Sequence, residues 1–161
     1  MKNSYRLKWD ERAGAAANAR RRLPALAAAF FALVRKLLAQ DPSPEKMHCL
    51  RLETKRLRYT LELFRPCYGP GLETRLAALR RLQNSLGELN DSAVAERMLV
   101  RSMDPSPQRA RVLRFLQQRT AAKAHEFRKD WTSLFDAPGQ ESWWREYLRR
   151  NARAPVRRPP P

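Results

Sequence analysis

The sequence predicts an all-α protein, an antiparallel bundle of about five to six helices. Its apolar residues recur at spacings of three and four, which is typical of helices with one buried face. Strand-like alternation is nearly absent, and the 161 residues include only five glycines. Short proline-containing breaks separate the helical stretches, which favours antiparallel neighbours. We expect a single domain over residues 1–150, because this length suffices for one hydrophobic core.

The first helical stretch is rich in alanine and spans residues 10–40. Pro24 lies inside it and is expected to kink the helix or to begin a new one. The residues that follow form an apolar stripe at helical spacing, made of Leu26, Phe30, Leu33, Val34, Leu37 and Leu38. In the next break, Asp41-Pro-Ser-Pro, we expect Ser43 or Asp41 to cap the second helix and Pro44 to lie in its first turn.

The second helix is expected over residues 45–65, because Pro66 cannot continue a helical hydrogen-bond pattern. A turn at Gly69-Pro-Gly follows it. The third helix is expected over residues 72–86, where leucines share one face. Gly87 then resembles a C-terminal helix signal.

Asn90 and Asp91 are residue types that cap helices, so we expect them to begin a fourth helix over about 91–103. A second break, Asp104-Pro-Ser-Pro, closely resembles the first in composition. A long fifth helix is expected over residues 106–134, ending before the Pro-Gly pair that follows.

A short last helix is expected over residues 140–150. It carries Trp143 and Trp144, which we expect to pack on the bundle rather than to stack on nucleic-acid bases. The remaining residues, 151–161, are basic and proline-rich and lack apolar content. We expect this tail to be disordered, because it has no apolar surface to bury.

The charge balance is strongly basic, with 33 lysines and arginines against 16 acidic residues and a net charge of +17. Such an excess disfavours an enzyme with an acidic surface and favours an anionic partner. Nucleic acid, a membrane surface and inorganic polyphosphate are all compatible with this charge. A solvated, arginine-rich surface without a site is the alternative explanation, because net charge alone does not define a binding site.

The expected location is the cytoplasm. Cys49 and Cys67 are the only cysteines, too few for a disulfide framework and without zinc-ligand spacing. The first residues contain no apolar core of a signal peptide. The longest apolar stretch, Leu23–Leu38, contains a proline and two basic residues and is too short to span a bilayer.

The second predicted helix gathers positive charge on one side. At 100° per residue, its core face is formed by Leu50, Leu57, Leu61 and Phe64. The opposite side carries a stripe at spacing i, i+3, i+7 and i+10, formed by His48, Arg51, Lys55 and Arg58. Tyr59 and Glu62 lie at the edges of this stripe, and Arg56 points away from it. Like charges at this spacing repel, which suggests that the stripe serves an anionic ligand. The alternative is a solvated face with acidic partners on another helix.

Catalytic and metal-binding motifs are missing from the sequence. It has no HExxH, no glycine-rich phosphate loop and no serine-histidine-aspartate order. We therefore expect no enzyme activity, no catalytic residue, no metal and no cofactor. Gln83 is polar within the apolar face of its helix, and we favour an interhelical hydrogen bond over a ligand contact there. Asn90 and Asp91 are favoured as caps rather than site residues.

Two segments together resemble the CHAD domain, the conserved histidine α-helical domain. The run HCLRLETKRLRYTLELF resembles the family pattern His-x-x-Arg-x-x-x-(Lys/Arg)-(Arg/Lys)-x-Arg-Tyr, and LRRLQNSLGELND resembles its partner pattern ending in LGxLND. The resemblance implies a helical bundle that binds inorganic polyphosphate without catalysis. It assigns the binding residues as His48, Arg51, Lys55, Arg56, Arg58 and Tyr59.

The sequence departs from the family in one respect. CHAD domains typically carry two related helical halves, each with a His/Arg helix, whereas one such helix is found here. A short single-repeat member is expected, either as a degenerate half or as a homodimer in which a twofold axis rebuilds the two-repeat architecture. No triphosphatase domain is recognised in the chain, so we expect a stand-alone member, and an association with polyphosphate granules is the corresponding expectation for its location. A helical nucleic-acid-binding protein is the alternative function, with nucleic acid as a competing ligand and no membrane partner.

Overall fold

The computed structural model describes residues 8–39 and 43–154, and within these ranges the regular structure is entirely helical. The all-α prediction is therefore confirmed. The elements lie in the order α1 (Ala15–Leu38), α2 (Pro44–Leu63), α3 (Arg65–Tyr68), α4 (Gly71–Ser102), α5 (Pro107–Leu134) and α6 (Gln140–Arg150).

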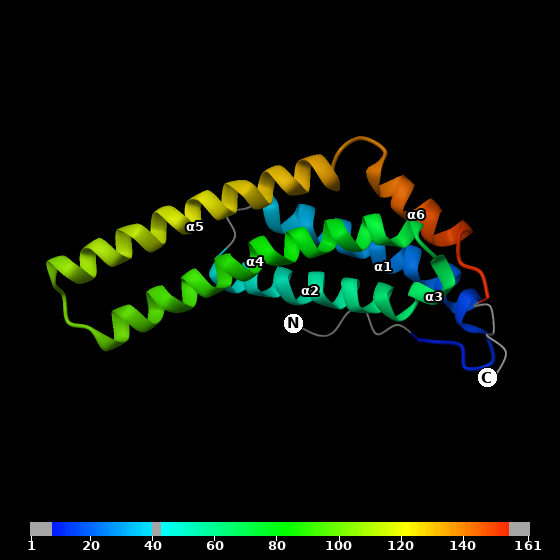
Figure 1. The fold of residues 1–161 in the computed structure, drawn as a ribbon, viewed down its shortest axis with the longest axis horizontal. Helices are drawn as coiled ribbons and strands as arrows, with labels where there is room; N and C mark the ends of the chain where they lie inside the picture. The colour runs from blue at the N-terminus through cyan, green and yellow to red at the C-terminus, as the bar shows by residue number, and fades with distance from the viewer. Residues whose placement is uncertain (1–7, 40–42, 155–161) are drawn as a thin grey trace.

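The helices form an elongated bundle with an arm at one end (Figure 1). Helices α1, α2 and α4 lie side by side in the body, and α6 packs on α1. Helix α5 runs antiparallel along α4, and the far end of this hairpin projects beyond the other helices. The core is built from the apolar stripes of the body helices, and Leu23, Phe31, Leu50, Leu57, Leu76, Leu79 and Trp144 are almost fully buried in it.

The first break in the chain has the predicted capping chemistry. The Ser43 hydroxyl accepts a hydrogen bond from the backbone N–H of Lys46 at 3.4 Å, and Pro44 is the first residue of α2. Ser106 caps α5 in the same way, at 3.1 Å from the Arg109 nitrogen. Asp41, the other predicted cap, lies outside the described residues.

The predicted helix break at Gly87 is wrong, because α4 continues from Gly71 to Ser102. A glycine in a helix interior costs only about 1 kcal/mol relative to alanine. The leucines on either side, Leu86 and Leu89, are buried and stabilise the helix through this position. The capping role expected for Asn90 and Asp91 is also wrong, since both lie in the interior of α4.

Pro24 does not begin a helix, since α1 is continuous from Ala15 to Leu38. Buried neighbours on both sides, Leu23 and Leu26, hold this segment in the core. The helix starts later than expected because residues 10–14 form a turn around Asn18. The Asn18 side chain donates hydrogen bonds to the carbonyls of Asp10 and Ala13 and accepts one from the Asp10 N–H.

The segment after α6 is packed in its first part. Ala152 is buried, and its carbonyl accepts a hydrogen bond from Arg20 at 2.6 Å. The backbone N–H of Arg153 donates to the carbonyl of Cys67 at 2.8 Å. Ala152 and Arg153, which lie beyond the predicted boundary at residue 150, are therefore part of the packed structure. The rest of the predicted disordered tail, 155–161, lies outside the described residues.

Candidate polyanion site between α2 and α4

The cationic stripe of α2 faces a matching stripe of α4. His48 Nδ1 lies 2.9 Å from Asn90 Oδ1, and Arg58 Nε lies 2.8 Å from Gln83 Oε1. A third contact, at 3.5 Å, joins Arg80 of α4 to Glu62 of α2. We call this interface the α2–α4 seam, defined by His48, Arg51, Lys55, Arg58 and Glu62 on α2 and by Arg80, Gln83, Gly87 and Asn90 on α4.

The two middle cations of the seam, Arg51 and Lys55, have no acidic partner among the described residues. Both side chains are half-buried. The Arg51 Nε is buried, and no residue of the described ranges provides a hydrogen-bond acceptor for it. A buried donor without a partner costs free energy, roughly 1–3 kcal/mol. An anionic ligand that reached this nitrogen would remove that cost.

Arg58 is held by its own chain. Its Nη1 donates to Glu62 at 2.6 Å, and its guanidinium lies 4.2 Å from the centre of the Tyr59 ring. Its side chain is only 13% exposed. The charge of Arg58 is therefore largely compensated, so this residue is not the open cation that the sequence suggested. The acidic partner comes from the same helix, four residues along, rather than from another helix.

Gln83 makes the interhelical hydrogen bond that was favoured from the sequence, and its partner is the predicted site residue Arg58. This bond accounts for a polar residue in the apolar face of α4. It also fixes the orientation of the Arg58 guanidinium toward α4.

His48 is exposed, and its contact with Asn90 determines what the imidazole can do. The amide oxygen of Asn90 is an acceptor, so Nδ1 of His48 must carry the hydrogen. The other ring nitrogen, Nε2, is then an acceptor in the neutral ring and a donor only in the protonated ring. An anion can therefore accept a hydrogen bond from Nε2 only when His48 is cationic.

Arg56 and Tyr59 lie apart from the seam contacts. Arg56 forms an ion pair with Glu53 at 3.6 Å, three residues before it on α2. Tyr59 is half-exposed and stacks on the neighbouring Arg58. The structure thus joins His48 and Arg58 to α4 and places Arg51 and Lys55 between them, whereas Arg56 points elsewhere, as its angular position on the helix indicated.

The α4 half of the seam was missed from the sequence, although a signal for it exists. Arg80, Gln83, Gly87 and Asn90 have the spacing i, i+3, i+7 and i+10, the same as His48, Arg51, Lys55 and Arg58. The predicted helix end at Gly87 divides these four residues between two helices, which hides their common spacing. A continuous α4 is what places these four residues on one face.

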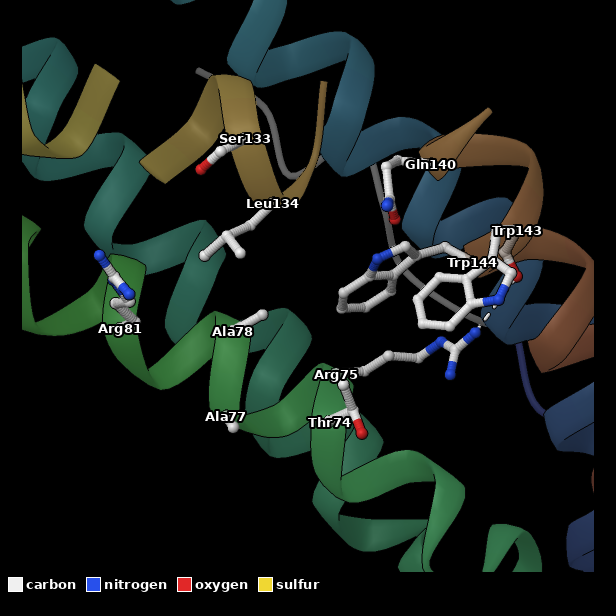
Figure 2. A pocket seen from close by; sticks show the side chains of 10 residues that line it. All are labelled: Thr74, Arg75, Ala77, Ala78, Arg81, Ser133, Leu134, Gln140, Trp143 and Trp144. Carbon is white, nitrogen blue, oxygen red and sulfur yellow. Dashed lines mark hydrogen bonds between the residues drawn. The ribbon is translucent and has the colours of Figure 1, made fainter. Parts of the chain in front are cut away.

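A second feature lies where α4, α5 and α6 meet (Figure 2). A pocket of about 360 Å³ is lined by Thr74, Arg75, Ala77, Ala78, Arg81, Ser133, Leu134, Gln140, Trp143 and Trp144. Arg75 is 2% exposed and has no carboxylate partner among the described residues. Its guanidinium lies 3.5 Å from the centre of the Trp143 ring and 3.6 Å from that of Tyr147. Burial lowers the pKa of Arg75 to about 10, so the side chain remains charged at neutral pH.

Arg75 attaches α6 to α4. Its Nη2 donates to the Trp143 carbonyl at 3.3 Å, and its Nη1 donates to the carbonyl of Gly71 at 3.2 Å. Trp144 packs in the core, and Trp143 covers the arginine while remaining half-exposed. Both tryptophans therefore pack on the bundle, as predicted.

The described residues contain no cluster of three or more histidine, cysteine, aspartate or glutamate side chains suited to a metal ion. Among the helices of the described ranges, none has the length and apolar character needed to cross a membrane.

The described residues form an all-helical bundle in which cationic side chains of α2 lie along polar side chains of α4. The CHAD domain family model matches residues 3–100, and the chain belongs to the CHAD domain family. CHAD domains are linked in general to polyphosphate binding. The matched region ends near the end of α4, so it contains the whole seam and leaves α5 and α6 outside it. Comparisons with curated proteins and with solved structures returned no match.

Proposed function

We propose that this protein binds inorganic polyphosphate without catalysing a reaction, through the α2–α4 seam. The observation that carries the proposal is the pair Arg51 and Lys55, two half-buried cations without an acidic partner among the described residues. They lie one helical turn apart, about 6 Å along the axis. A polymer of phosphates can place successive negative charges along such a row, which a single small anion cannot do.

The seam residues contribute in different ways. Arg51 presents a planar fork that matches phosphate oxygens, and Lys55 provides a compact charge. His48 adds a donor at Nε2 when it is protonated. Arg58 is held by Gln83 and Glu62, so it contributes mainly through its positive electrostatic potential and by setting the position of α2 against α4. Arg56 and Tyr59 are proposed from the family pattern alone, at the edge of the site.

Titration with long-chain polyphosphate tests this assignment. We expect the double variant Arg51→Ala/Lys55→Ala to bind at least tenfold more weakly than the unmodified protein. Its control is Arg111→Ala/Arg114→Ala, which removes the same charge from exposed positions of α5. The seam variant should also show a shallower dependence of affinity on salt, because fewer counterions are exchanged for phosphate contacts. Equal losses in the two variants would mean that net charge, not the seam, determines binding.

Competition separates polyphosphate from nucleic acid. At equal phosphate concentration, polyphosphate should displace a bound RNA or DNA oligonucleotide, and the oligonucleotide should not displace polyphosphate. Nucleic-acid binding would instead be favoured by stacking on exposed aromatic residues, and the seam has one at its edge, Tyr59. Incubation with polyphosphate and Mg²⁺ should release no phosphate. Protein-dependent release would overturn the non-enzymatic assignment.

We also propose that two chains pair in solution. The C-terminal part of α4, the loop after it and the N-terminal part of α5 expose large apolar side chains, which are Val94, Met98, Val100, Met103, Val112 and Phe115. Exposed apolar residues gathered on one element favour association. Light scattering should give a solution mass of twice the chain mass, and Met98→Lys/Phe115→Lys should return it to that of one chain.

In cells, we propose a cytoplasmic location for this protein, with recruitment to polyphosphate granules.

A further inference from the structure

One position of the α2–α4 seam, Gly87, is a glycine and therefore has no side chain. Three contacts pair the ends of the seam: His48 with Asn90, Arg58 with Gln83, and Glu62 with Arg80. These pairs fix the antiparallel register of α2 against α4. Between the first two pairs, α2 presents Arg51 and Lys55, and α4 presents Gly87 on the same face as Gln83 and Asn90. The two cations of α2 therefore face the position at which α4 has no side chain.

The fold itself does not require glycine at this position. The glycines with positive φ are Gly69 and Gly139, so Gly87 has ordinary helical geometry. A Cβ added at Gly87 would meet no atom within 4 Å, so no neighbouring group needs the space. Glycine in the interior of a helix is less stable than alanine. The open space at Gly87 thus has no explanation in backbone conformation or in packing within the described residues.

A second observation indicates what this space accommodates. Arg51 is one of the two cations opposite Gly87, and its Nε is buried without an acceptor. A phosphate supplies oxygens in a geometry that suits an arginine fork, and such an oxygen would serve as the acceptor that this nitrogen lacks among the described residues. The open space and the unpaired donor lie on facing sides of the same interface.

We infer that one phosphate group of the bound polymer occupies the space over Gly87, between Arg51 and Lys55. This inference rests on the proposed polyphosphate function and adds a specific position to it. Gly87 acts as a steric opening that admits the polymer to the interface between α2 and α4. The phosphate accepts hydrogen bonds from Arg51 and Lys55, and no covalent bond is made or broken.

Filling the space tests the inference. Gly87→Leu should lose at least tenfold in affinity for long-chain polyphosphate, and Gly87→Ala should lose less. The thermal midpoint of Gly87→Ala should rise, because alanine stabilises the helix. The control Ala77→Leu places the same leucine side chain at an exposed position of α4 outside the seam, and should bind like the unmodified protein. Wild-type affinity in Gly87→Leu would overturn the inference. Gly87→Leu could fail to fold. In that case the inference is overturned by unchanged affinity in Gly87→Ala together with an unshifted Gly87 amide resonance in the unmodified chain.

A spectrum of the unmodified chain provides a measurement without substitution. On addition of polyphosphate, the amide resonance of Gly87 should shift by more than those of Gly69 and Gly139, which lie in turns away from the seam. Binding with an unshifted Gly87 resonance would overturn this inference and leave the proposed function standing. No binding by the unmodified protein would overturn the proposed function, and the inference with it.

Discussion

Arg58 and Gln83 are joined across the bundle by a hydrogen bond of 2.8 Å from the guanidinium Nε to the amide oxygen. One residue lies in each of the two segments that carry the family resemblance. The bond therefore brings these two segments into contact in the fold. Together with the contact of His48 and Asn90, it sets the register in which α4 meets the cations of α2.

Gln83→Leu should destabilise the fold. The substitution leaves the Nε of the largely buried Arg58 guanidinium without its acceptor. A buried donor without a partner costs about 1–3 kcal/mol. Urea denaturation followed by circular dichroism measures the change in the free energy of unfolding. Asn84→Leu, at the adjacent exposed position, is the control and should change stability little. A Gln83→Leu protein as stable as the control would show that the bond contributes nothing.

His48→Ala should bind long-chain polyphosphate more weakly than the unmodified protein. His48 lies at one end of the seam, where its contact with Asn90 at 2.9 Å holds the ring beside the cations of α2. Isothermal titration calorimetry measures the affinity. His125→Ala, which removes the exposed histidine of α5, is the control and should bind like the unmodified protein. Equal affinities in the two variants would show that His48 contributes nothing to binding.

Arg75→Met should loosen α6 from α4. The substitution keeps an apolar stem but removes the two hydrogen bonds to carbonyls and the stacking on Trp143 and Tyr147. Desolvated cation–π contacts are worth about 2 kcal/mol, so we expect a loss of roughly that size in unfolding free energy. Arg145→Met removes an exposed arginine of α6 and is the control. Red-shifted tryptophan fluorescence should accompany the loss in Arg75→Met alone. Identical spectra and stabilities in the two variants would contradict the attachment.

Cys67 should react with iodoacetamide at least tenfold more slowly than Cys49 at pH 8. Cys67 is buried in α3, and burial raises the pKa of its thiol, so less of the reactive thiolate is present. Cys49 is only half-buried. Mass spectrometry of the single-cysteine variants Cys49→Ala and Cys67→Ala measures each rate separately. The same variants in urea should react at similar rates, and a fast reaction of Cys67 in the native protein would contradict its burial.

Helical periodicity was sufficient for much of the fold. The spacing of Leu50, Leu57 and Leu61 predicted the buried face of α2, and Ser43 predicted its start, because both signals lie within a single helix and its cap. Local signals failed at Gly87 and Asn90, where tertiary contacts outweigh a modest helix preference. The short α3 also went unpredicted, since its four residues provide too little pattern.

The candidate site likewise has one part that the sequence predicts and another that depends on helix packing. The row of His48, Arg51, Lys55 and Arg58 is a property of one helix, and the sequence alone determined it together with the basic charge and the family pattern. Which of these cations stay open was decided only by the tertiary structure. Arg58 is paired with Glu62 on its own helix and hydrogen-bonded to Gln83 on α4. The register of these contacts leaves Arg51 and Lys55 opposite Gly87, which has no side chain. The reason is physical: 3.6 residues per turn places residues on a face of a single helix, but only the packing register between two helices decides which residues meet.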